Sequence, residues 1–425
     1  MLKIEQLQYS DDGKKITYKY SCSANIAKYF HVKDPFFVSY DIDVTKVPKS
    51  IAMIPFLANV VPIAWFTGFD IEVEELDATF HQSLLKLKEE FSKFFPQIKK
   101  DIKLHVGKLV QNTIEGNEQA LLFSGGLDSF ESLTRNIKQK PYLISVLGAD
   151  IEISDKKRWN DFMKFNNEEE IIDQNKLCYV TANLRTFYTY EVDILANLSW
   201  WGKIQHGMAL ISLIAPLSYL HKITTIKIAS SNTSEVHFGW GSTAETDEKV
   251  QWANQKVIHD GFQFKRTEKI QNLVDFTKNT GMYPKLRVCY SELRDGYNCN
   301  KCAKCQRTML GLILCGENPN KYGFEVPSNF YELILNNFKA NVKMTVGVKY
   351  EWACLQQKGT QISNPFIIEN KEKEKISINE FLNLNLDKII STASKEISNS
   401  TIKKYIIKTK YPKLFKLYLK IRRKF

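Results

Sequence analysis

The chain has little of what marks a secreted or disulfide-stabilised protein. Its first residues, MLKIEQLQYSDDGKK, contain no apolar core of a signal peptide, so we expect a cytoplasmic protein. Eight cysteines in 425 residues are few, and this number fits a reducing compartment. Clustered thiols in such a compartment more often bind metal than form disulfides. There are no internal repeats and no low-complexity tracts.

Long hydrophobic runs are also scarce, and only residues 50–69 (SIAMIPFLANVVPIAWFTGF) lack charge over the length of a membrane span. Pro55 and Pro62 interrupt this run and Asn59 lies near its middle. Proline removes a backbone donor and breaks helices, and no second candidate span exists. We therefore expect a buried, irregular core segment and no transmembrane helix.

The last 25 residues contain no acidic residue, and they carry most of the net positive charge of the chain. The net charge is +12, but residues 401–425 hold ten Lys or Arg and no acid, so the remainder carries only +2. Four apolar residues in this tail share one helical face: Leu414, Leu417, Ile421 and Phe425. The tail suits an anionic membrane, a nucleic acid or an acidic partner, and we favour an acidic partner protein.

Apolar patterns divide the chain into three regions and predict an α/β fold. Residues 1–112 alternate as in a small α+β domain, and residues 318–425 are mostly helical with the basic tail at their end. Residues 117–317 alternate short apolar runs with helical patterns, which is typical of a parallel sheet. A five-stranded parallel sheet is predicted there, with strands at 118–123, 142–147, 177–181, 224–229 and 285–290.

The first of these strands ends abruptly in LLFSGGLDSF, residues 121–130. Gly125 and Gly126 permit positive φ and leave no Cβ in the way of a ligand. Amides of such a turn, the helix N-terminus and the hydroxyls of Ser124 and Ser129 can converge on phosphate oxygens. Asp128 can cap the helix or help to hold Mg²⁺. The alternative is an ordinary capped turn; both the Walker and the dinucleotide-binding patterns are absent.

Residues Phe123 to Ser129 resemble the signature of the PP-loop ATP pyrophosphatases, whose fold is the adenine nucleotide α-hydrolase type. The resemblance implies that this loop holds the β,γ-pyrophosphate of ATP while an acceptor oxygen attacks the α-phosphorus. It implies ATP-binding residues near the second strand end and along the loop: Leu147, Gly148, Phe123, Ser124, Gly125, Gly126, Leu127, Asp128 and Ser129.

A cysteine cluster follows the fifth predicted strand, in LRVCYSELRDGYNCNKCAKCQRT. Cys289 precedes Cys299, Cys302 and Cys305, which are spaced by three, and no histidine lies among them. Four thiolates suit a closed, tetrahedral, structural Zn²⁺ site. Free buried thiols and an iron–sulfur cluster are the alternatives.

The loop and the cysteine quartet together resemble the 7-cyano-7-deazaguanine synthase family of the queuosine pathway, over about residues 117–317. Arg307 matches an arginine that trails the quartet, and Arg266, Glu268 and Lys269 match an Arg-x-Glu-Lys segment. The resemblance implies ligase chemistry with ATP, Mg²⁺ and Zn²⁺. In that chemistry, activation of a deazaguanine carboxylate releases pyrophosphate, and an amine then displaces AMP. Catalytic roles are implied for Asp128, Ser124 and Lys269.

The chain departs from this family at several places. An Arg-Asn pair is replaced by His206 and Gly207, and a long polar loop at 230–252 carries Glu245 and Asp247. We expect substrate contacts from His206, Glu245, Asp247 and Arg266. The terminal extensions resemble those of long members in bacterial antiviral defence clusters, which implies that the amine belongs to a protein and the product is an amide.

Two other functions fit the same residues. A tRNA-modifying PP-loop enzyme would explain the basic tail, because lysines neutralise phosphates. A non-catalytic, nucleotide-sensing subunit of a complex would also keep a phosphate loop.

Overall fold

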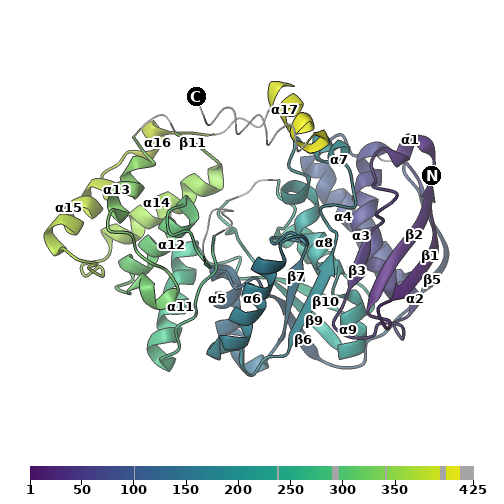
Figure 1. Cartoon of the computed structure of the whole chain (residues 1–425), viewed down its shortest axis with the longest axis horizontal. Coiled ribbons are helices and arrows are strands. Elements are labelled where there is room, and N and C mark those ends of the chain that lie inside the picture. The colour runs from purple at the N-terminus through teal and green to yellow at the C-terminus, as the bar shows by residue number, and fades with distance from the viewer. Residues whose placement is uncertain (100, 237–238, 290–295, 340–341, 393–398, 412–425) are drawn as a thin grey trace.

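A ten-stranded, mostly parallel sheet runs through the computed structural model (Figure 1), which describes residues 1–99, 101–236, 239–289, 296–339, 342–392 and 399–411. The strand order is β10-β9-β6-β7-β8-β3-β2-β1-β4-β5. The α/β class is therefore correct, but the sheet has ten strands and not five. Along the chain the strands are β1 (Leu2–Ser10), β2 (Lys15–Cys22), β3 (Phe37–Ser39), β4 (Ile71–Asp77), β5 (Leu104–Val110), β6 (Glu118–Leu122), β7 (Tyr142–Leu147), β8 (Leu177–Ala182), β9 (Ile223–Ala229) and β10 (Lys256–Asp260).

The strands of the first 112 residues do not form a separate sheet. Strand β3 pairs antiparallel with β8, with Val38 opposite Ala182, and β2, β1, β4 and β5 continue outward from it. Without β3, the backbone groups of β8 would form an open edge, which proteins generally cover. The sequence pattern cannot show this pairing, because the two strands are about 140 residues apart.

Four of the five strands predicted in residues 117–317 are confirmed, and the fifth, at 285–290, is wrong. The described part of that segment is hydrogen-bonded to the loop after β6 and to the end of a 3-10 helix instead: Arg287 N donates to Gly125 O at 2.7 Å and Leu286 N donates to Tyr322 O at 2.9 Å. The fifth parallel strand is β10, which pairs with β9. Its apolar signal is weak, since the side chains that it buries are only Val257 and His259.

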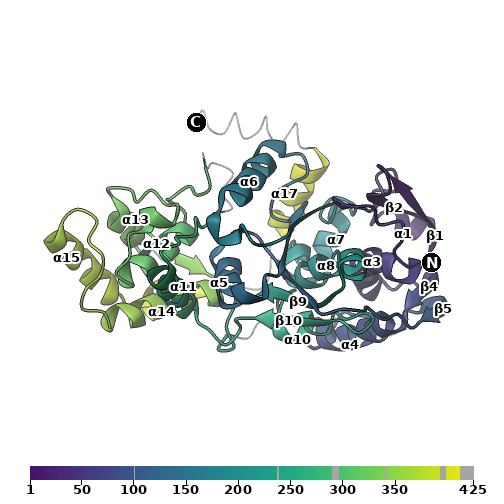
Figure 2. The ribbon, with the colours of Figure 1, turned by 90° about the horizontal axis from the view of Figure 1, so that it is seen from below.

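Two helical layers cover the sheet (Figure 2). Residues of the central strands alternate between two cores, as Ala120 and Leu121 do in β6, so both faces of these strands are buried. One core includes residues of α3 (Ile54–Thr67), α4 (Ala78–Phe94), α8 (His206–Ser212) and α9 (Ala215–His221). The other includes residues of α5 (Leu127–Arg135), α6 (Lys156–Glu168), α11 (Arg266–Thr280) and α12 (Ala303–Leu314).

Helix α3 lies in the uncharged stretch at 50–69. The stretch is buried, as expected, but it forms a regular helix where an irregular segment was expected. All residues of α3 except Thr67 are buried. Pro55 stands in the first turn, where no N–H is needed, and Pro62 is accommodated inside the helix. Asn59 donates from Nδ2 to Pro55 O and accepts from Gln205 Nε2. Across the described ranges, no helix combines the length and the apolar character needed to cross a bilayer.

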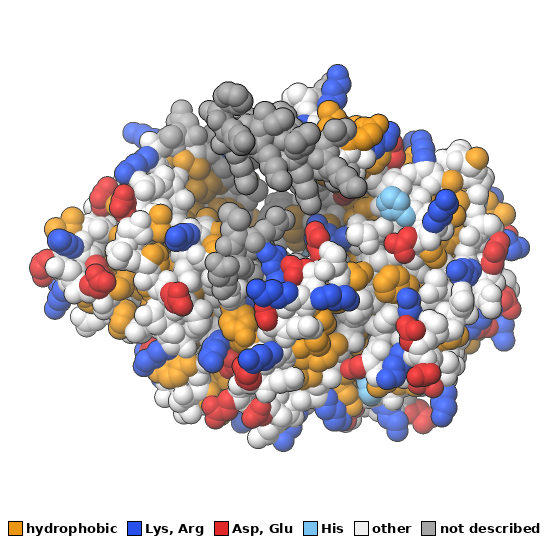
Figure 3. Space-filling model, viewed as in Figure 1, with side chains coloured by type: hydrophobic (Ala, Val, Ile, Leu, Met, Phe, Trp, Pro, Cys, Tyr) orange, Lys and Arg blue, Asp and Glu red, His pale blue; other side chains and the backbone are white. Residues whose placement is uncertain are grey.

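The C-terminal region packs its helices beside α11 and α12, on the left of Figure 1. They are α13 (Phe330–Asn336), α14 (Val346–Thr360), α15 (Lys371–Leu382) and α16 (Leu386–Ile389), with a small parallel pair of strands β11 (Val342–Met344) and β12 (Ile390–Thr392). Helix α17 (Asn399–Lys410) instead contacts α7 (Tyr190–Leu195), where Tyr405 OH donates to Asp193. Residues 412–425 of the basic tail lie outside the described part. On the face seen in Figure 3, acidic and basic side chains are interspersed.

Candidate functional site

The Ser-Gly-Gly-Leu-Asp-Ser loop joins β6 to α5 in the way that its residues predict. Gly125 has φ +70°, in the left-handed region that favours glycine, and Gly126 is the N-cap residue of α5. Ser129 Oγ donates to Gly126 O at 3.1 Å and lies 3.4 Å from Ser124 Oγ. The first-turn amides of α5 have no intrahelical acceptor, so they are available to an anion.

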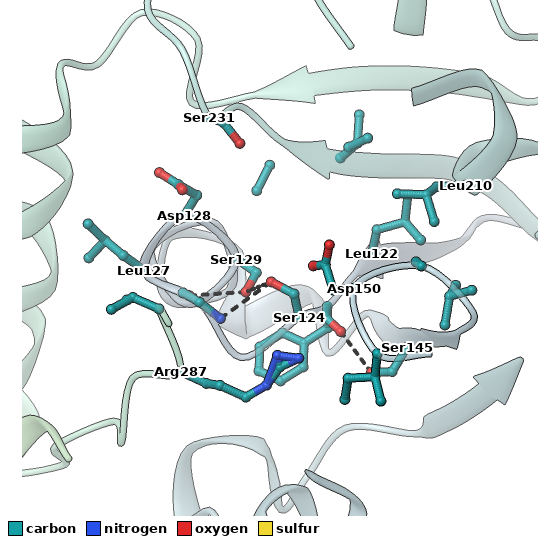
Figure 4. Close-up of a pocket in the computed structure, with 18 of the residues that line it drawn as sticks. Leu122, Ser124, Leu127, Asp128, Ser129, Ser145, Asp150, Leu210, Ser231 and Arg287 are labelled. Carbon is teal, nitrogen blue, oxygen red and sulfur yellow. Dashed lines mark hydrogen bonds between the residues drawn. The ribbon is translucent and has the colours of Figure 1, made fainter. Parts of the chain in front are cut away.

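A cavity of about 140 Å³, here named cavity A, lies over this loop. Its wall comes from the carboxyl ends of β6, β7 and β9, which is where open α/β sheets bind ligands. Figure 4 shows Ser124 and Ser129 in its middle, Asp128 and Asp150 on opposite sides of them, and Arg287 across the loop. Among the predicted residues, the cavity is lined by Phe123, Ser124, Gly126, Leu127, Asp128, Ser129, His206 and Arg266.

Basic side chains converge on cavity A from three separate segments. Arg266 opens α11, Arg287 lies in the extended segment before the cysteines, and Lys304 lies in the first turn of α12. Lys269, one turn into α11, is nearly buried, and its Nζ lies 3.6 Å from Asp128 Oδ1. A cavity with first-turn amides and several cations is suited to a polyanionic ligand.

Asp128 lies within this set of cations. Its Oδ2 is 3.3 Å from Arg266 Nη1. Burial acts to raise the pKa of Asp128, but Arg266, Lys269 and Lys304 together lower it below its usual value. Burial also lowers the pKa of Lys269, against the opposing effect of Asp128. Asp128 is therefore ionised at neutral pH, and the nearby protein cations already balance its negative charge.

The C-terminal region contributes a carboxylate to the same network. Glu351 of α14 accepts a hydrogen bond from Arg307 Nε at 2.6 Å, and its Oε2 lies 3.8 Å from Arg266 Nε. Arg266 is thus held between Asp128 of the loop and Glu351, and the Arg307 guanidinium lies 5.8 Å from the Trp352 ring. Glu351 gives no sequence signal, because it stands in an ordinary helical pattern about 220 residues after the loop.

His206 lines cavity A from the first turn of α8. Its Nδ1 is buried and makes no hydrogen bond within the described chain, and the ring packs against Trp201. Burial lowers the pKa of His206, with Asp150 and Asp247 opposing the shift. The imidazole is therefore neutral at pH 7 and can accept or donate one hydrogen bond through each nitrogen.

Three of the predicted ATP-binding residues shape the fold around cavity A without lining it. Gly125 provides the turn of the loop, and Leu147 is buried in the core. Gly148 has φ +104°, and a Cβ at this position would lie only 1.8 Å from Ala182 O, so this glycine serves close packing. The residues that follow Gly148, among them Asp150, make the cavity wall instead.

Two of the predicted substrate-binding residues, Glu245 and Asp247, also lie outside cavity A. The loop that carries them turns toward β10, where Asp247 Oδ2 lies 2.8 Å from His259 Nδ1. Glu245 borders a different cavity, beside helix α4. Neither acid lines cavity A, because their part of the loop folds over the edge strand β10, whereas Ser231 at the start of the loop reaches the cavity. A substrate contact from Glu245 or Asp247 stays a prediction.

The four cysteines of the quartet come together, although Cys289 lies ten residues before the first of the other three. All four sulfur atoms lie within 4.8 Å of one another, and no disulfide joins them. The distances are 3.8 Å for Cys289–Cys302, 4.0 Å for Cys299–Cys305 and 3.5 Å for Cys302–Cys305. Hydrogen bonding from Cys305 lowers the pKa of Cys302 to about 4, whereas the same bond and burial raise that of Cys305. The group can hold a metal ion.

Sequence reasoning missed Arg287, Lys304 and Asp150 in cavity A. Lys304 lies inside the Cys-Ala-Lys-Cys segment and Arg287 lies two residues before Cys289, so both cations adjoin the cysteine quartet. Their position beside the predicted metal ligands could have marked both residues in the sequence, since residues next to a bound structural metal ion are held rigidly. Asp150 follows the second strand of the motif region and could be found only as a strand-end residue.

We compared the chain with known proteins, and no family model, no curated protein and no solved structure matches it. Function is therefore inferred from the site itself.

Proposed function

We propose that this protein is an ATP-dependent enzyme that activates the carboxylate of a 7-deazaguanine and transfers it to an amine, with AMP and pyrophosphate as products. The observation that carries the proposal is the convergence in cavity A of first-turn amides, serine hydroxyls and cations. Arg266, Arg287 and Lys304 line the cavity beside the loop. Such donors stabilise the charge that develops on departing pyrophosphate.

In the proposed reaction, a carboxylate oxygen of the substrate attacks the α-phosphorus and the bond to pyrophosphate breaks. The amine nitrogen then attacks the acyl carbon, AMP leaves with the bonding electron pair, and the amine loses a proton. The loop and the cations hold the triphosphate so that the α-phosphorus meets the acceptor oxygen. His206, neutral and at the cavity wall, is suited to contact the base or the reacting groups.

Mg²⁺ would supply further charge neutralisation on the phosphates. Asp128 is already close to Arg266 and Lys269, whereas Asp150 lines the cavity and has no hydrogen bond or ion pair within the described residues. Carboxylates are the side chains that Mg²⁺ prefers. Asp150 is thus the better candidate ligand.

We further propose Zn²⁺ for the cysteine group, in a structural role. Four sulfurs each about 2.3 Å from one ion in a tetrahedron lie about 3.8 Å apart. The sulfur separations of 3.5, 3.8 and 4.0 Å agree with this value and leave room for a single ion instead of an iron–sulfur cluster. The ion would fix the segments that carry Arg287 and Lys304.

The central test incubates the protein with ATP, Mg²⁺ and 7-carboxy-7-deazaguanine and measures AMP and pyrophosphate. Lys304→Met should lower kcat/KM about 100-fold, because a transition-state charge loses a donor. The matched control is Lys301→Met, since Lys301 is exposed in the same segment and does not line cavity A. No carboxylate-dependent pyrophosphate, or equal loss in both variants, would refute the proposal.

A protein amine as the acceptor, in an antiviral defence setting, is the more specific form of this proposal. It rests on the family resemblance and on the terminal extensions. Intact-mass measurement of proteins co-expressed from neighbouring genes tests it. We expect one neighbour to gain a deazaguanine acyl group, and unchanged masses for all neighbours would contradict it.

A further inference from the structure

A second cavity, here named cavity B, lies at the β10 edge of the sheet. Its volume is about 160 Å³. Helix α4, the described parts of the loop at 230–236 and 239–252, and the β10 segment surround it, and the lining includes Glu90, Lys93, Phe94, Ser242, Glu245, His259 and Phe262. It contains Glu245, one of the two loop acids that the sequence predicts as substrate-binding and that cavity A leaves out.

The key group in cavity B is a buried histidine fixed by a buried carboxylate. The side chain of His259 is 1% exposed, and its Nδ1 lies 2.8 Å from Oδ2 of Asp247, which is fully buried. The same Oδ2 accepts from Ser242 Oγ at 2.7 Å. A carboxylate only accepts hydrogen bonds, so Nδ1 of the neutral ring carries the proton and Nε2 presents a lone pair.

The Nε2 atom of His259 is buried and has no hydrogen-bond partner in the described chain. About nine in ten buried polar groups have a partner, so this atom is expected to bond to a group that is not among the described residues, and a ligand of cavity B can supply that group. The ring cannot turn to find another acceptor or donor, because Asp247 holds Nδ1 and Phe262 packs edge-on at 5.4 Å. A ligand of cavity B that contacts Nε2 of this tautomer must donate a hydrogen bond to it.

The charges around cavity B define the ligand further. Glu90 is compensated by Lys93 at 2.7 Å and by Lys249 at 3.1 Å. The Glu245 carboxylate, in contrast, makes neither an ion pair nor a hydrogen bond within the described ranges. Two aromatic rings, Phe94 and Phe262, complete the lining, and ring faces attract cations. Lys93 also lines the cavity, but it is paired with Glu90, so among the described side chains the Glu245 carboxylate and His259 Nε2 are the acceptors left for a ligand, beside apolar surface.

We propose that cavity B binds a small primary amine as its alkylammonium ion. One N–H donates to His259 Nε2, Glu245 supplies the opposite charge, and the alkyl part contacts the phenyl rings. An amine is the class of molecule that the proposed function requires as acceptor. The binding proposal goes beyond that function, since it predicts a second site and is tested without ATP.

The experiment titrates the full-length protein with ethylammonium chloride at constant ionic strength and pH 7.5, by calorimetry and by NMR of ¹⁵N-labelled histidine. Ethanol and sodium acetate are the comparison probes. We expect ethylammonium to bind most tightly and to shift the Nε2 signal that disappears in His259→Gln. Glu245→Gln, a change at the surface, should weaken ethylammonium binding about tenfold and leave ethanol binding unchanged.

The matched control is His221→Gln, because His221 Nε2 is also buried without a partner in the described chain but lies outside cavity B. Ethylammonium binding should be unaffected by it. Acetate or ethanol binding as tightly as ethylammonium, no detectable ethylammonium binding, or equal binding by wild type and Glu245→Gln would each overturn the proposal. Absence of pyrophosphate release from ATP would refute the proposed function alone and leave this result standing.

Discussion

Cavities A and B both border the parallel sheet but have opposite chemical character. Cavity A combines first-turn amides with Arg266, Arg287 and Lys304, whereas cavity B presents acceptors from His259 and Glu245. The first is built from a local loop plus distant cations, and the second from side chains of three separate segments. The comparison teaches that the end of a strand provides a hollow, while the groups around it decide which charge it accepts.

The largest expected effect comes from the cysteine quartet, which could hold a metal ion and which adjoins cavity A. Cys289→Ser should lower the free energy of unfolding by about 4 kcal/mol through loss of the ion and should abolish pyrophosphate release. Metal content and thermal unfolding measure this. Cys178→Ser, buried outside the quartet, should cost about 1 kcal/mol and retain the metal. An unchanged metal content in Cys289→Ser would contradict the assignment.

A change at the loop turn should have the next largest effect. Gly125→Ala introduces strain at φ +70° and places a Cβ 3.3 Å from Phe165, so we expect a loss of about 2 kcal/mol and of activity. Gly281→Ala is the control, since Gly281 has φ +77° but nothing within 4 Å of a Cβ. It should lose about 1 kcal/mol and keep activity. Binding of ethylammonium in cavity B should survive both changes.

The link between the C-terminal region and cavity A is tested at Glu351. Glu351→Gln should raise KM for ATP about tenfold with a smaller change in kcat, because Arg266 and Arg307 lose the carboxylate that positions them. Lys349→Gln, on the same helix and paired only with exposed Asp387 among the described residues, should change KM less than about twofold. Equal effects from the two variants would remove Glu351 from the site.

The smallest effect concerns the acid dependence of stability. The pKa of Asp128 is below its usual value, so its ion pairs stabilise the fold above the unfolded-state pKa near 4, and that stabilisation disappears as pH falls through the folded-state pKa. The free energy of unfolding of the wild type should therefore exceed that of Asp128→Asn by about 1 kcal/mol at pH 6, and the difference should shrink steadily as the pH falls below the unfolded-state pKa. Urea unfolding at each pH measures it, and a pH-independent difference would contradict the ion-pair account.

The sequence was most informative where one short segment defines the structure. The loop at 123–129, four parallel strands and the cysteine quartet all follow from local patterns. The strand predicted at 285–290 and the omission of β10 have one cause: apolar residues show that a segment is buried but not what its backbone pairs with. The segment with Arg287 is hydrogen-bonded to Gly125 and to Tyr322, which belong to no strand, while β10 buries a histidine.

The sequence by itself determined the turn at Gly125 and Gly126, because glycine conformation, hydroxyls and helix capping act within a few residues. It also determined that four thiols would be available to one metal ion. Only the tertiary structure decided that the N-terminal strands extend the same sheet and that Glu351 reaches Arg266. It likewise separated Glu245 from cavity A. These outcomes depend on contacts between residues far apart in the chain, which no local pattern encodes.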